Sequence, residues 1–269
     1  MTTTTTTRAG AAGHPVVHVE PVMGTMVTIT IDGVGLAAED VDAAVVEACA
    51  ELHRADRVFS TWTAWSPMSR LRRGAVRLDQ LPDDVAAEIS SVLALCWDAR
   101  RATDGWFDPW AMPGGVDPTG LVKGWAIEQA MGVLDKASMA SAVVNGGGDI
   151  VVHGDSPEPG GWRIGVQHPW RRGALACVVA VDHAVATSGG YERGTHLVDP
   201  RRGVRTAGAV ASATVTGPSL AVADALATAV AVGADEALAL VGGLPGYEAY
   251  LIGHDGREIS TPGFPSVPA

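Results

Sequence analysis

The close spacing of short strand-like segments constrains this 269-residue chain more than any other feature of its sequence. Segments in which apolar and polar residues alternate follow one another at hairpin-like distances, among a few long segments with helical periodicity. Parallel strands need a long crossover between them, so this crowding favours a mixed or antiparallel sheet flanked by helices. We therefore expect an α+β fold rather than a doubly wound parallel sheet.

The periodicity also gives the expected elements. Strands are expected at Val16–Val19, Met26–Ile31, Ser141–Val144, Asp149–His153, Trp162–Gln167, Cys177–Val181, Val185–Thr187, Ala211–Thr216 and Glu248–Ile252. Helices are expected at Ala37–Phe59, Asp83–Arg101, Lys123–Leu134, Ser219–Val232 and Asp235–Val241. We expect one two-lobed domain over residues 16–260, between a disordered tail at 1–15 and a short tail at 261–269.

The segment from Phe59 to Leu71 is expected to be a loop rich in hydroxyl groups and tryptophans. Loops of this composition often bind ligands. The alternative is that Trp62 and Trp65 close the lid of the core.

Composition excludes several classes of function. The formal net charge of −11 argues against nucleic-acid binding, which needs a surplus of Lys and Arg. No window is apolar enough for a membrane span, and the threonine-rich start lacks the apolar stretch of a secretory signal. We expect a cytoplasmic protein, with export as the alternative if the start site is misassigned.

Cys49, Cys96 and Cys177 are expected to be buried free thiols.

Four polar, glycine-containing segments could together form a phosphate and metal site: Asp117–Gly124, Asn145–Asp149, Thr187–Gly203 and Ala223–Thr228. Asp224 and Thr228 are four residues apart on an apolar helix and share a face, where a hard cation would satisfy both. The alternative is that Thr228 bonds to the Asp224 carbonyl and Asp224 is exposed or caps a neighbour.

The other segments leave alternatives open as well. Lys123 at a helix start would favour an anion, although the spacing is not that of a P-loop. The run from Gly146 to Gly148 would let a ligand approach the backbone, or would form a tight turn between strands. His196 is a candidate general base, with Asp199 close by to orient it.

The order and spacing of these motifs resemble the ApbE family of FAD:protein FMN transferases. The resemblance runs from Val22 to Gly253 and is carried by Met23–Thr25, Phe59–Trp62, Ser69–Leu71, Gly105–Pro109, Asp117–Gly124, Asn145–Asp149, Ser188–Arg193, His196–Gly203 and Ala223–Thr228. It implies a T-fold-like, two-lobed domain that requires magnesium. It also implies transfer of FMN from FAD to a threonine hydroxyl of an acceptor flavoprotein, with release of AMP.

The resemblance also assigns residues. It implies metal ligands at Asp224, Thr228 and the carbonyls of Gly120 and Ala227, and FAD contacts at Met23, Trp62, Trp106, Phe107, Asp108, Asp117, Lys123 and Leu197. We add Gly146, Gly147 and Ser188 as candidate FAD contacts, and His196, Asp199 and Lys123 as candidate catalytic residues. Two alternative functions are a magnesium-dependent FAD pyrophosphatase and an FAD-binding protein without turnover.

The chain departs from the family pattern at several positions. Trp62 stands where many members have tyrosine, and Trp65 and Pro67 replace the usual acidic residues. Gly190 and Ala227 stand where some members carry aspartate, which implies a metal held by fewer charges. The segment between Pro109 and Asp117 is short, which implies a more open substrate side.

Overall fold

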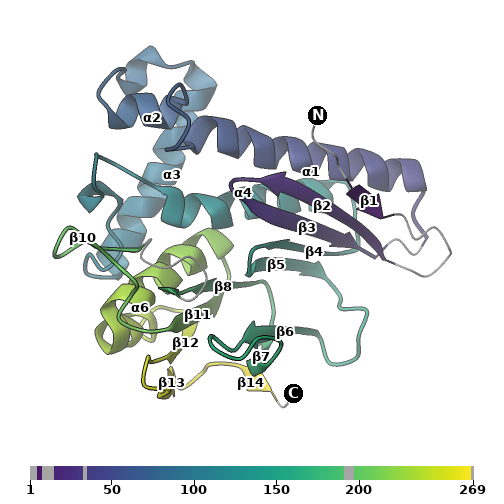
Figure 1. Ribbon diagram of the computed structural model, residues 1–269. Coiled ribbons are helices and arrows are strands. Elements are labelled where there is room, and N and C mark those ends of the chain that lie inside the picture. The colour runs from purple at the N-terminus through teal and green to yellow at the C-terminus, as the bar shows by residue number, and fades with distance from the viewer. Residues whose placement is uncertain (1–4, 8–14, 33–34, 191–196, 268–269) are drawn as a thin grey trace.

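A twisted, nine-stranded antiparallel sheet forms the centre of the molecule (Figure 1). The computed structural model describes residues 5–7, 15–32, 35–190 and 197–267. The strand order in the sheet is β1-β2-β3-β4-β5-β8-β11-β12-β13. The strands are β1 (Thr5–Thr7), β2 (Val16–Val22), β3 (Thr25–Ile31), β4 (Ser141–Gly146), β5 (Asp149–Gly154), β8 (Ala184–Ser188), β11 (Ser212–Gly217), β12 (Glu248–Ile252) and β13 (Glu258–Ser260).

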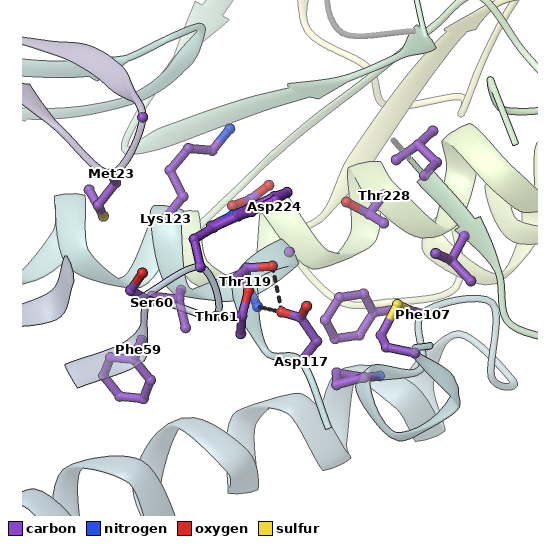
Figure 2. A pocket seen from close by; sticks show the side chains of 18 of the residues that line it. Met23, Phe59, Ser60, Thr61, Phe107, Asp117, Thr119, Lys123, Asp224 and Thr228 are labelled. Carbon is purple, nitrogen blue, oxygen red and sulfur yellow. Dashed lines mark hydrogen bonds between the residues drawn. The ribbon is translucent and has the colours of Figure 1, made fainter. Parts of the chain in front are cut away.

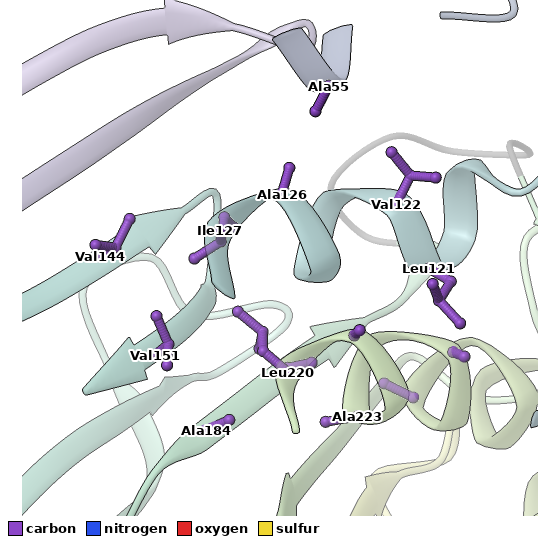
Figure 3. Close-up of a cluster of buried hydrophobic side chains, with 14 of the residues drawn as sticks. Ala55, Leu121, Val122, Ala126, Ile127, Val144, Val151, Ala184, Leu220 and Ala223 are labelled. Atoms are coloured by element: carbon purple, nitrogen blue, oxygen red, sulfur yellow. The ribbon is translucent and has the colours of Figure 1, made fainter. Parts of the chain in front are cut away.

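Three long helices pack in a row on one face of this sheet. They are α1 (Ala38–Phe59), α4 (Thr119–Lys136) and α6 (Leu220–Val241). Helix α4 lies between the other two and contacts both, and Figure 3 shows apolar side chains of α4 and α6 facing those of the sheet. Two further α-helices, α2 (Pro67–Arg72) and α3 (Asp83–Ala102), and two 3₁₀ turns, η1 (Leu78–Gln80) and η2 (Pro109–Ala111), lie between α1 and α4 in the chain. The main core is thus formed between the sheet and the α1, α4 and α6 row.

A smaller sheet covers part of the opposite face. It consists of β6 (Trp162–Gln167), β7 (Leu175–Val181) and β14 (Ser266–Val267), in the order β14-β7-β6. Successive residues of a strand point to opposite faces, so Val151 of β5 enters the main core while Ile150 and Val152 pack in a second cluster with Val179. A hairpin of β9 (Leu197–Asp199) and β10 (Val204–Thr206) completes the described elements.

The expected α+β class and antiparallel sheet are confirmed, because every pairing between described strands is antiparallel. Most expected elements are found within a few residues of their predicted ends. Thr5–Thr7 and Ser266–Val267, which fall in the expected tails, form β1 and β14 and pair with β2 and β7.

Two local expectations were wrong. The Phe59–Leu71 segment is not only a loop, because Ser66 caps the short helix α2 by accepting a hydrogen bond from the Ser69 N–H at 3.0 Å. Helix α4 begins at Thr119, so Lys123 lies in its second turn rather than its first. The break expected between the Ser219–Val232 and Asp235–Val241 helices is confirmed, because α6 is kinked at Ala234, where φ is 47° and the backbone is not helical.

None of the helices in the described part of the chain combines the length and the apolar composition of a transmembrane segment.

Candidate functional site

A cavity of about 770 Å³ opens where α1, α4 and α6 meet the loops that precede α2 and α4 (Figure 2). Twelve of the residues expected at the site line it: Met23, Trp62, Trp106, Phe107, Asp108, Asp117, Gly120, Lys123, Ser188, Leu197, Asp224 and Thr228. These residues span more than 200 positions of the sequence, so the fold brings the separate motifs to one place.

Lys123 is held on the cavity wall by a buried carboxylate. Its ammonium pairs with Oδ2 of Asp149, a residue with no exposed surface at the start of β5. The Thr187 N–H of β8 donates to the other oxygen of Asp149 at 3.1 Å. A buried carboxylate needs such partners, so Asp149 fixes the direction of the lysine stem.

Asp224 and Thr228 lie one turn apart on α6 and both reach the cavity (Figure 2). Asp224 is 3% exposed, and its Oδ2 accepts a hydrogen bond from the Gly124 N–H of α4 at 3.2 Å. The Thr228 hydroxyl lies 3.3 Å from that of Ser188. The alternative in which Asp224 is exposed does not hold, because its carboxylate lies between two helices.

The two helices approach so closely here because glycine is present. A Cβ on Gly124 would lie 2.5 Å from the Leu220 carbonyl oxygen, and one on Gly120 would lie 3.2 Å from Phe107 and 3.7 Å from the Thr228 hydroxyl. The absence of a Cβ at Gly120 and Gly124 thus lets the first turns of α4 approach α6 closely.

The oxygen donors at this point suit a magnesium ion. A buried carboxylate, a hydroxyl and backbone carbonyls are hard ligands of the kind that Mg²⁺ prefers. The absence of a side chain on Gly120 leaves the backbone there open toward Thr228. The residues present therefore fit the cation that the resemblance implies.

Acidic residues at the cavity are also part of the local structure. Asp117 accepts hydrogen bonds from the backbone and hydroxyl of Thr119 at 3.1 and 2.6 Å, and Arg72 donates to its other oxygen at 2.5 Å. Asp108 accepts from Arg100 at 2.7 Å and from the Trp110 N–H at 2.9 Å. Both carboxylates thus hold the loop between α3 and α4 in place.

Aromatic side chains supply flat surfaces at the cavity. Trp62 is 91% exposed and its neighbour Trp65 is 80% exposed, so neither closes the lid of the core. Trp106 lies under the Arg201 guanidinium, 3.7 Å from ring centroid to carbon, and its buried Nε1–H has no partner among the described residues. An exposed indole and an unsatisfied donor at one cavity are features of a ligand site.

Several expected site residues do not line the cavity. Gly146 and Gly147 form the end of β4 and the turn to β5, where a Cβ on Gly146 would meet Ile127 at 2.5 Å and Gly147 has a φ of +68°. Ala227 is buried in α6, between Asp224 and Thr228. Asp199 organises the β9–β10 turn by accepting from the backbone N–H groups of Arg201 and Arg202 at 2.9 and 3.2 Å. His196 lies outside the described residues.

Sequence reasoning missed the arginines of the site and the partner of Lys123. Arg72 and Arg205 line the cavity, as do the hydroxyl residues Ser60, Thr61 and Thr63. Arg72 directly follows the Ser69–Leu71 motif, and Asp149 ends the Asn145–Asp149 motif, so both were adjacent to signals already noted. Only the folded chain shows that they face the cavity or its lysine.

The structure explains why position 190 is a glycine and not an aspartate. A Cβ at this position would lie 2.1 Å from the Ala207 carbonyl oxygen, so no aspartate fits here without a backbone shift.

Burial disfavours the thiolate forms of Cys96 and Cys177. Burial raises the pKa of Cys96 to about 12, with a smaller contribution from the Asp117 charge, and burial raises that of Cys177 to about 11. Both thiols remain protonated at neutral pH, and a protonated thiol is not a nucleophile. Cys49 and Cys96 are buried as expected, whereas Cys177 is partly exposed.

Comparisons with known proteins agree with the resemblance seen in the sequence. A model of the ApbE family matches residues 23–114 and 111–251. The FAD:protein FMN transferase of Rhodobacter capsulatus is 32% identical over 160 residues, which are 55% of this chain and 30% of that protein. The FAD:protein FMN transferase of Treponema pallidum is 32% identical over 167 residues, or 55% of this chain and 46% of the relative. These matched regions span less than half of the length of the curated relatives.

Solved structures show the same fold. The flavin transferase ApbE from Vibrio cholerae superposes with a TM-score of 0.80 at 21% identity, over 94% of this chain and 98% of the other. The Pseudomonas stutzeri flavinyl transferase ApbE gives 0.78 at 22% identity, over 95% and 97%.

Proposed function

Because this chain belongs to the ApbE family, we propose that it transfers FMN from FAD to a threonine hydroxyl of an acceptor flavoprotein. The threonine oxygen bonds to the phosphorus on the flavin side of the diphosphate, and the bond from that phosphorus to the bridging oxygen of AMP breaks. The hydroxyl proton goes to a base, and AMP leaves with the bridging oxygen. FAD and protein become FMN-protein and AMP, with no change of oxidation state.

The observation that carries this proposal is the meeting of cations and buried oxygen donors at one cavity. Lys123, Arg72 and Arg205 line it, as do Asp224 and Thr228. A diphosphate bears negative charge that must be neutralised before an alcohol can attack it. A cavity with both kinds of group suits such a substrate better than a neutral one.

Each part of the site has a role in this proposal. Asp224, Thr228 and the carbonyls of Gly120 and Ala227 would hold Mg²⁺, which supplies charge neutralisation at the diphosphate. Lys123, directed by Asp149, binds a phosphate oxygen. The rings of Trp62, Trp106 and Phe107 offer surfaces for the flavin or the adenine.

The base is proposed on sequence grounds. His196 precedes β9, whose first two residues, Leu197 and Val198, line the cavity. We propose that His196 accepts the threonine proton and that Asp199 orients it. The cytoplasmic location of the protein and the identity of the acceptor stay predictions.

Mass spectrometry tests this proposal. The protein is incubated with FAD, Mg²⁺ and candidate flavoproteins of the same cell, and each acceptor is compared with its threonine-to-alanine variant. An FMN adduct on the threonine, together with one equivalent of AMP, is the expected result. Free FMN and AMP without an adduct would identify a pyrophosphatase, and bound FAD without AMP would identify a binding protein.

Asp224→Ala and Asp235→Ala are a matched pair on α6. Asp224 lies at the cavity, whereas Asp235 is exposed and pairs with Arg257 at 3.0 Å. We expect Asp224→Ala to abolish AMP release and its Mg²⁺ dependence, and Asp235→Ala to retain both. Normal turnover in Asp224→Ala would contradict the metal assignment.

A further inference from the structure

A cluster of metal-binding side chains lies between β2 and α1, and none of its members lines the cavity. His18 and Glu20 are two residues apart on β2, so both point to the same face of the sheet. Cys49 and His53 are four residues apart on α1 and share one face of the helix. Figure 1 shows α1 running over this part of the sheet. Each of the two elements thus contributes two potential metal ligands.

The donor atoms converge. Nε2 of His18 lies 3.0 Å from Oε2 of Glu20, and Nε2 of His53 lies 2.8 Å from Oε1 of the same carboxylate. One donor atom each from His18, Glu20 and Cys49 lies within 4.8 Å of the other two. These three donors are close enough to share one ion, and His53 reaches the same carboxylate through its other oxygen.

The Glu20 carboxylate is buried and is held as an anion by its histidine partners. His18, Glu20 and Cys49 are buried, beside apolar residues such as Val22, Val45 and Leu52. Burying a carboxylate is unfavourable unless it is paired. Burial raises the pKa of Glu20, but the hydrogen bonds and charges of His18 and His53 outweigh this effect, so the pKa lies below its usual value. The carboxylate is therefore an anion in a largely apolar setting.

We propose that His18, Glu20, Cys49 and His53 bind a zinc-type divalent cation. Imidazole, carboxylate and thiolate groups are all zinc ligands, and four of them complete a tetrahedral site. One carboxylate and one thiolate neutralise the two positive charges, so the bound site carries no net charge. The nitrogen and sulfur donors distinguish this site from the one at Asp224, whose donors are all oxygen and suit magnesium.

Binding releases a proton and transfers no electrons. The S–H bond of Cys49 breaks as the metal–sulfur bond forms, and the proton leaves to solvent. In the metal-free protein Nε2 of each histidine donates to the Glu20 anion, so the proton of each neutral ring moves from Nε2 to Nδ1 when Nε2 coordinates the metal. In the absence of the metal, the same groups are held by the hydrogen bonds to Glu20.

The ion would join β2 to α1, two elements that continue to the cavity. Met23 directly follows β2, Phe59 ends α1, and both residues line the cavity. The expected role is structural, because the four ligands leave no open position for a substrate.

Cobalt titration tests the site in the full chain. Metal-free Asp224→Ala protein, which lacks the oxygen site, is titrated with Co²⁺ in an excess of Mg²⁺. We expect one equivalent to bind, with a thiolate-to-cobalt charge-transfer band and tetrahedral d–d absorption, and Zn²⁺ to displace the cobalt. Cys49→Ser should abolish the charge-transfer band, whereas Cys177→Ser, at a partly exposed cysteine of β7, should keep it.

Histidine variants test the site independently of whether Cys49→Ser folds. The His53 side chain is 42% exposed, so His53→Ala should fold and should bind Zn²⁺ at least about tenfold more weakly. His153→Ala, at a partly exposed histidine of β5, is the control and should bind normally. Absence of Co²⁺ binding, or a band that persists in Cys49→Ser, overturns the proposal. Unchanged Zn²⁺ affinity in His53→Ala removes His53 from the ligand set and overturns the four-ligand site.

Discussion

At the scale of single residues, a substitution at Trp62 tests ligand binding without disturbing the folded core. Its indole is almost fully exposed at the cavity, so Trp62→Ala removes a surface for stacking but no core contact. We expect FAD binding to weaken by about 1–3 kcal/mol, as for other base–aromatic stacking contacts. Thermal stability should not change.

Trp65→Ala is the control for this prediction, since Trp65 is also exposed but does not line the cavity. Fluorescence titration with FAD measures both variants. Equal losses of affinity in the two would show that Trp62 has no specific contact with the ligand.

The Lys123–Asp149 pair is expected to contribute to both stability and function. Lys123→Met leaves a fully buried carboxylate without its cation, which costs about 3–5 kcal/mol when buried pairs are broken. Adding Asp149→Asn removes the unpaired charge, so the double variant should regain much of the unfolding free energy while AMP release stays lost. Urea denaturation and AMP assays measure the two effects. A double variant no more stable than Lys123→Met would contradict this account.

At the scale of elements, Glu128 of α4 caps the start of α6. Its carboxylate accepts hydrogen bonds from the N–H groups of Leu220 and Ala221 at 2.5 and 3.3 Å and from the Ser219 hydroxyl at 3.2 Å. Glu128→Ala leaves these donors unsatisfied, and we expect a loss of about 1–2 kcal/mol in unfolding free energy. Gln129→Ala, at the exposed next position, should have little effect. Matching denaturation midpoints in the two variants would be evidence against the cap.

Elements with long periodic signals could be predicted from the sequence, and those set by tertiary contacts could not. Helix α1 was predicted to within one residue because its apolar positions recur over six turns. Strands β9, β13 and β14 have only two or three residues, too few to show a period. The start of α4 was missed because the helix begins directly after Pro118, with Asp117 accepting from the Thr119 N–H, a pattern that resembles a turn.

The residues of the functional site could likewise be predicted only in part from the sequence. Motifs indicated Asp224, Thr228 and Lys123, since each is polar in an otherwise apolar segment. Arg72 and Arg205 carry no such signal, because surface arginines are common and only their position in the fold places them at the cavity. Likewise Cys49 and His53 meet His18 and Glu20 only through the packing of α1 on β2.

At the scale of the whole molecule, buried thiols and phenols predict alkaline sensitivity. Burial raises the pKa of Cys96 and Tyr247 to about 12, and that of Cys177 to about 11. Burial also raises the pKa of Tyr250, which donates to Glu258 at 2.7 Å. These groups ionise first in the unfolded chain, which then binds fewer protons than the folded one.

Stability should therefore be constant below the ordinary pKa values of about 9–10 and should fall as the pH rises through about 11–12. Urea denaturation at a series of pH values measures this decline. Tyr250→Phe removes one of the titrating groups, so its curve should fall less steeply, and a curve parallel to that of the unchanged protein would exclude Tyr250 as a contributor.

The close contact of Gly124 with the Leu220 carbonyl joins residues that lie almost a hundred positions apart in the chain. Both walls of the cavity exist only after α6 has docked, which requires that most of the polypeptide has left the ribosome. Nascent chains shorter than this have no place for a nucleotide. A ligand that contacts both walls can therefore stabilise the chain only after α6 has docked.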